Sequence, residues 1–221
     1  YKRQGTVFVA SDGAFTYDPP IAFRGVDTFA YTVRNASGSN RAIVTIDVTG
    51  ETVWFVDDTA AAGGDGTINA PFNSFAPVNG SGGVGDIDSV GNTIFVYEGS
   101  YSVEFDLESG QKLIGHSEGL DLIGTANDVA AATTPALTTS GSFPIVELFG
   151  AGGAVRGFAI NNTNSQAISG TSISNFTIAN VAITAGITSS GAVAFIGTSG
   201  TNTLNNVDIT GTVPSGNSAF A

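Results

Sequence analysis

The last third of the sequence repeats one six-residue pattern, which reads VRGFAI at Val155–Ile160, ISNFTI at Ile173–Ile178, IANVAI at Ile178–Ile183 and LNNVDI at Leu204–Ile209. Apolar residues alternate along each copy, and a period of two indicates a β-strand. A Gly or an Asn interrupts the alternation, and both residues tolerate a left-handed backbone that can turn the chain between two short strands. Repetition at roughly 20 to 50 residues indicates a solenoid, in which each coil buries its apolar side chains against the next coil.

The Gly and Asn residues set the register of the coils. We take Gly157, Asn180 and Asn206 as structural bend positions, because the flanking apolar pattern fixes them there, rather than as ligands for a glycan. Their spacings, 180 − 157 = 23 and 206 − 180 = 26, correspond to one coil each. Val181 and Ile183 should then point into the interior, between the apolar pairs of the two neighbouring coils (Phe158 with Ile160, and Val207 with Ile209). A second column of strands is predicted near Val146, Ile168, Val193 and Ala219.

Composition excludes several classes of function. Residues 1–50 carry five basic and four acidic side chains, whereas residues 51–221 carry only Lys112 and Arg156 against fifteen acidic side chains, a net charge of −13. Nucleic acids and anionic membranes need clustered Lys and Arg, so we expect neither as a partner. The chain has no Cys, which excludes disulfides and cysteine nucleophiles. No apolar run approaches the roughly 20 residues of a membrane-spanning helix.

The sequence of residues 1–49 predicts β-hairpins. Strand patterns at 6–9, 14–17, 28–33 and 42–48 are separated by turn residues, which gives four strands where a complete immunoglobulin-like sandwich has seven. Two motifs of this region are DGAFTY at Asp12–Tyr17 and DTFAYTV at Asp27–Val33. With these motifs the region resembles the second half of the tandem cadherin-like/immunoglobulin-like repeats of giant bacterial surface proteins. The resemblance implies a partial immunoglobulin/cadherin-like domain that lacks its opening strands.

Residues 50–221 contain a second set of motifs. A strand pattern at Val53–Val56 precedes Asp57 and the loop GGDGT at Gly63–Thr67, and a strand at Thr93–Tyr97 ends in Glu98-Gly99. This succession resembles the entry cap of pectate-lyase-like right-handed parallel β-helices, particularly the non-catalytic forms in bacterial surface proteins. The resemblance implies an all-β chain: a partial immunoglobulin-like sandwich at 1–49, joined to a right-handed parallel β-helix at 50–221, with an N-terminal cap at about 50–101 and an incomplete C-terminal end.

Few residues qualify as a functional site. Asp57, Asp58 and Asp65, with the carbonyl-rich loop Gly63–Thr67, are the candidate oxygen ligands of a calcium ion, and Asp86 with Asp88 is the alternative pair. Tyr97 and Tyr101 are candidates for stacking on sugar rings, with core packing as the alternative. The remaining candidates are single residues. His116 is the only histidine and is expected as an exposed loop residue, and Arg156 and Asp208 have no acidic partners at matching positions of neighbouring coils.

These observations favour a structural or adhesive role over an enzymatic one. We expect an extended stalk or filament of a large, extracellular bacterial surface protein, continued by flanking repeats or identical subunits, with surface glycans as possible ligands. One alternative is a polysaccharide lyase or hydrolase whose catalytic coils lie outside this segment, and another is a carbohydrate-binding module. Neither a catalytic residue nor an organic cofactor is expected within the chain.

Overall fold

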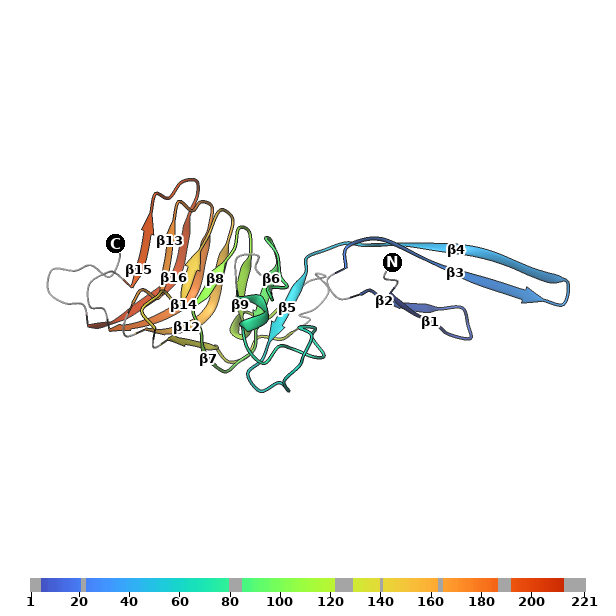
Figure 1. The fold of residues 1–221 in the computed structure, drawn as a ribbon, viewed down its shortest axis with the longest axis horizontal. Coiled ribbons are helices and arrows are strands. Elements are labelled where there is room, and N and C mark those ends of the chain that lie inside the picture. The colour runs from blue at the N-terminus through green and yellow to red at the C-terminus, as the bar shows by residue number, and fades with distance from the viewer. Residues whose placement is uncertain are drawn as a thin grey trace. The chain divides into compact units, whose positions relative to one another are not determined.

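The computed structural model describes residues 5–20, 23–79, 85–121, 129–139, 141–162, 165–186 and 192–212. Nearly all regular structure in these ranges is β, with two short 3₁₀ turns at Ala76–Val78 and His116–Glu118 (Figure 1). The chain divides into two compact units, Tyr1–Thr52 and Val53–Ala221.

The first unit consists of two antiparallel hairpins, as the sequence predicts. Strands β1 (Thr6–Val9) and β2 (Phe15–Asp18) form one, and the longer strands β3 (Gly25–Asn35) and β4 (Gly38–Val48) form the other. The buried carboxylate of Asp27 on β3 links the two hairpins, because its Oδ2 accepts hydrogen bonds from the Gly5 N–H (3.1 Å) and the Tyr17 hydroxyl (2.7 Å). A buried carboxylate is stable only when such donors replace its water.

The second unit contains two parallel sheets. The larger sheet has the strand order β16-β14-β12-β9-β6-β5, with β10 and β7 joined to its side, and the smaller sheet has the order β15-β13-β11-β8. The strands of the larger sheet are β5 (Val53–Val56), β6 (Thr93–Val96), β7 (Ser100–Ser102), β9 (Lys112–Gly115), β10 (Ala136–Thr139), β12 (Ala154–Asn162), β14 (Thr177–Gly186) and β16 (Thr203–Thr212). The strands of the smaller sheet are β8 (Phe105–Leu107), β11 (Val146–Leu148), β13 (Ile168–Thr171) and β15 (Val193–Ile196). Every pair of strands in these sheets is parallel.

The predicted register of the repeats is confirmed. On β14, Val181 pairs with Phe158 of β12 and with Val207 of β16, and Ile183 pairs in the same way with Ile160 and Ile209. In the smaller sheet Val146 pairs with Ile168, and Ile168 pairs with Val193, as the second predicted column requires. Ala219, the fourth member of that column, lies outside the described residues.

The stacked apolar residues form one continuous core between the two sheets. Val155, Ile178, Val181 and Ile183 are essentially inaccessible to solvent, and residues of the smaller sheet such as Ile168 belong to the same cluster. Close packing of equivalent positions on successive strands therefore holds the second unit together.

Candidate functional site

The sharp turn in the middle of β12, β14 and β16 organises the most distinctive surface of the second unit. Gly157, Asn180 and Asn206 lie at this turn with φ of 76°, 54° and 53°, in the left-handed region. Gly has no Cβ to clash there, and Asn adopts this conformation more readily than other side chains. Each strand therefore changes direction at the same position, and a corner runs across neighbouring strands.

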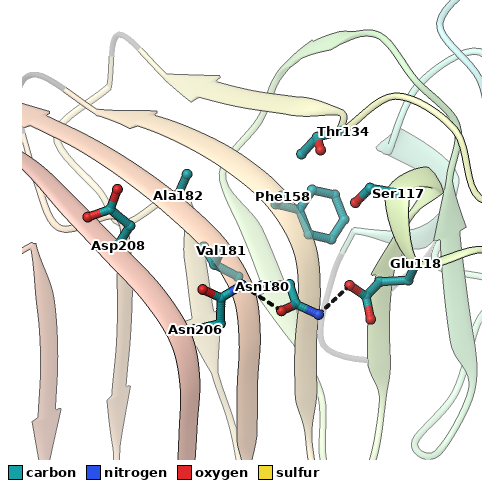
Figure 2. A pocket seen from close by; sticks show the side chains of 9 residues that line it. All are labelled: Ser117, Glu118, Thr134, Phe158, Asn180, Val181, Ala182, Asn206 and Asp208. Carbon is teal, nitrogen blue, oxygen red and sulfur yellow. Dashed lines mark hydrogen bonds between the residues drawn. The ribbon is translucent and has the colours of Figure 1, made fainter.

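A chain of hydrogen bonds, which we call the amide ladder, runs along this corner (Figure 2). The amide of Asn206 donates from Nδ2 to Asn180 Oδ1 (2.9 Å), and Asn180 donates from Nδ2 to Glu118 Oε1 (2.7 Å). The second oxygen of Glu118, Oε2, lies 3.0 Å from a guanidinium nitrogen of Arg156. The Glu118 carboxylate is therefore the last member of the amide ladder. Its contacts with the Asn180 amide and the Arg156 guanidinium both involve a charged group, and such contacts are stronger than neutral hydrogen bonds.

The segment that follows β9 places Glu118 in the corner. This segment forms the 3₁₀ turn His116–Glu118, and the Ser117 hydroxyl donates to the Gly157 carbonyl (3.1 Å). A Cβ on Gly157 would lie only 2.7 Å from Ser117 Oγ and from Glu118 Cγ. Two features therefore favour Gly at the bend position of β12. The backbone has a positive φ, and the segment His116–Glu118 leaves no room for a side chain.

Beyond Glu118 the corner opens into a groove of about 420 Å³. Its lining residues are Ser117, Glu118, Thr134, Phe158, Asn180, Val181, Ala182, Asn206 and Asp208 (Figure 2). We call it the corner groove. It combines carboxylates, amides and hydroxyls with a small apolar surface, and its volume falls within the usual range of ligand-binding sites.

The ionisable side chains that line the corner groove are the carboxylates of Glu118 and Asp208, and Arg156 lies beside Glu118. Arg156 is engaged by Glu118 in an ion pair. Asp208 pairs in register with Ala182, and Ala182 with Ala159, so the carboxylate is not repeated on the neighbouring strands.

The three aspartates predicted to bind calcium each accept hydrogen bonds from other groups of the chain. Asp57 Oδ1 accepts from the N–H (2.9 Å) and hydroxyl (2.7 Å) of Thr59, and Asp65 Oδ1 accepts in the same way from Thr67 (3.1 and 2.7 Å). The bonds from Thr67 lower the pKa of Asp65. Asp58 Oδ2 accepts from the Ser100 N–H (2.9 Å). Within the described ranges, no three His, Cys, Asp or Glu side chains gather in a geometry that would hold a metal ion.

The aromatic candidates differ in exposure. Tyr101 is only 4 % exposed, its ring packs edge-on against Phe75 at 5.5 Å, and its hydroxyl donates to the Tyr97 carbonyl (3.0 Å). Tyr101 therefore faces the core, where a sugar cannot stack on it. Tyr97 is partly exposed and lies 5.0 Å from the ring of His116.

His116 is less exposed than expected from the sequence. It is half-buried, and its Nδ1 accepts a hydrogen bond from the Glu98 N–H (3.3 Å). It thus supports the packing of the segment that follows β9.

Asp88, which the sequence offered only as part of an alternative pair of calcium ligands, lies in a buried polar network. Gln111 is fully buried and donates from Nε2 to Asp88 Oδ2 (2.7 Å), and Asp88 is 8 % exposed. Burial raises the pKa of Asp88 to about 8, helped by the hydrogen bond that protonated Asp88 donates to the neighbouring carboxylate of Asp86 and by the negative charges of Asp86 and Glu108. Asp88 is therefore largely protonated at neutral pH.

Comparison with known proteins gives one positive result. Residues 2–49 match the family described as bacterial Ig domain. Searches of curated proteins and of solved structures found no match. In the described parts of the chain, no helix has the length and apolar character needed to cross a membrane. Most of the first unit is therefore similar to bacterial Ig domains, which are often found on the cell surface.

Proposed function

We propose that the chain is a structural or adhesive segment of a large bacterial cell-surface protein. In this proposal the immunoglobulin-like residues 1–49 precede a right-handed parallel β-helix, which forms part of an extended extracellular stalk.

The observation that carries the proposal is the repeated parallel register of β12, β14 and β16. Val155, Ile178 and Leu204 pair across the three strands, as do Ile160, Ile183 and Ile209. Such a register can be extended by further coils, each advancing by the spacing of neighbouring strands, about 4.8 Å. Parallel strands joined by crossover connections are right-handed in nearly all proteins, which supports the same hand here.

One further observation supports an extracellular location, and another fits a segment that is exposed to solvent. The match to bacterial Ig domains covers residues 2–49. The strongly acidic composition beyond residue 50 suits a solvated surface and opposes contact with nucleic acids or anionic lipids. The lyase or hydrolase alternative places its catalytic coils outside this segment, so it does not depend on the corner groove.

Labelling of intact cells tests the proposal. Antibodies raised against the whole chain should label unpermeabilised cells that express the parent protein, and brief protease treatment of those cells should remove the label. A cytoplasmic protein of the same cells serves as the control for leakage. Labelling that appears only after permeabilisation would contradict the proposal.

A further inference from the structure

The corner groove has the features of a binding surface, in addition to the structural role of the bend beside it. Its polar wall is the amide ladder, with Asn180 and Asn206 in fixed orientations beside Glu118 (Figure 2). Each carboxamide has two N–H groups, and the ladder uses one of each. The remaining N–H groups of Asn180 and Asn206 belong to neighbouring strands, so both can donate hydrogen bonds to one extended ligand.

The ladder also lowers the cost of binding. Asn180 is held on both sides, by Asn206 and by Glu118, and Arg156 holds Glu118 in turn. Side chains that are already ordered lose little conformational freedom when a ligand arrives. The wall is therefore preorganised.

The exposed apolar floor of the groove is small, because the lining residue exposed on β14 is Ala182. Ala182 pairs in register with another alanine, Ala159 of β12. Thr134 and Asp208 add a hydroxyl and a carboxylate at the margins. A sugar chain matches this combination, because it presents apolar C–H faces together with hydroxyls that donate to carboxylates and accept from amides.

Charge narrows the class of sugar. The groove contains the carboxylates of Glu118 and Asp208, and Arg156, the basic residue beside it, is paired with Glu118. Chains of uronate or sulfated sugar would be repelled. We propose that the corner groove binds a neutral polysaccharide that runs along the corner across β14 and β16. This inference rests on the proposed adhesive role and gives it a ligand class.

Affinity electrophoresis of the whole chain tests the proposal. Native gels would contain one soluble polymer each: a β-glucan, a mannan, a galactan and a xylan as neutral probes, and polygalacturonate and alginate as anionic probes. At least one neutral polymer should retard the protein, and the two anionic polymers should not.

Substitutions locate the binding surface. Ala182→Tyr fills the floor and should weaken retardation tenfold or more, and Asp208→Ala should weaken it to a smaller extent. Thr171→Tyr adds the same ring at an exposed position of β13 in the other sheet and should leave retardation unchanged. Thermal unfolding of each variant checks that it folds.

Three results would overturn the proposal: no retardation by any of the neutral polymers, equal or stronger retardation by the anionic ones, or full retardation of a folded Ala182→Tyr protein. Labelling of intact cells is a separate readout. A protein that is on the cell surface but is not retarded retains the proposed function and loses the ligand.

Discussion

Replacing Val181 with Asp is the sharpest perturbation of the stacked core. Val181 is 1 % exposed and lies between Phe158 and Val207 on the neighbouring strands. The substitution loses the burial of a valine, worth about 1.5–3 kcal/mol. It also places a carboxylate among apolar side chains, which adds roughly 1–3 kcal/mol or more. The free energy of unfolding should fall by at least about 3 kcal/mol.

The assay can follow the second unit alone. Trp54 is the only tryptophan of the chain, and it is buried in the core of that unit. For a unit of this size, about 2–4 °C of melting temperature corresponds to 1 kcal/mol, so Trp54 fluorescence should show a decrease of at least about 6 °C. Thr184→Asp is the matched control, because Thr184 lies on the same strand, is exposed and has its hydroxyl 3.5 Å from that of Thr210. Its cost should stay within about 1 kcal/mol.

Equal melting temperatures for Val181→Asp and Thr184→Asp would refute the reasoning. The inward and outward positions of β14 would then have been assigned wrongly.

The remaining predictions concern pH, the bend, calcium and activity. The pKa of Asp88 is raised from 3.8 to about 8 in the folded protein, so the contribution of Asp88 to stability is fully present below about pH 4 and is lost as the pH rises through 8. Asp88→Asn should therefore flatten this part of a stability–pH profile. An unchanged profile would contradict the raised pKa of Asp88. At the bend, Asn180→Ala should destabilise the protein by about 1 kcal/mol more than Asn180→Gly in urea unfolding, because both lose the ladder but only Ala is strained at positive φ; equal costs would remove the strain argument. If the aspartate loops bind calcium, a chelator should lower the melting temperature and Asp65→Asn should abolish that difference, whereas identical curves with calcium and with chelator would exclude the site. Incubation with polygalacturonate or alginate, with and without calcium, should release no unsaturated or reducing ends; turnover that disappears in Arg156→Ala would establish the enzymatic alternative.

The sequence predicted the regular part of the second unit well. Alternation around Asn180 and Asn206 fixed which side chains face inward, since a shift of one residue would place every apolar side chain outside. The four strands of the first unit were also predicted correctly, because glycines and short polar loops mark their ends.

The site was harder to predict because its contacts join distant parts of the chain. Glu118 meets Asn180 across 62 positions, and Gln111 meets Asp88 across 23. No local pattern encodes such pairs. One signal was present: Gly occupies the bend of β12 where the later strands have Asn, which indicates a crowded corner. Tyr101 was hard to assign for a different reason. An aromatic residue between two serines is equally typical of a sugar-stacking surface and of a core position, so the sequence does not distinguish the two roles.

Cross-linking across neighbouring strands tests the central claim, a coil-by-coil parallel stack, most directly. The chain has no cysteine, so the variant T184C/T210C can be oxidised against a clean background. Thr184 and Thr210 are paired in register, and neighbouring strands lie about 4.8 Å apart, within the Cα–Cα range of a disulfide. The account predicts an intramolecular bridge in T184C/T210C and none in T184C/L204C, because Leu204 pairs instead with Ile178. Bridging in the second variant, or in neither, would contradict the stacked register on which the proposed function depends.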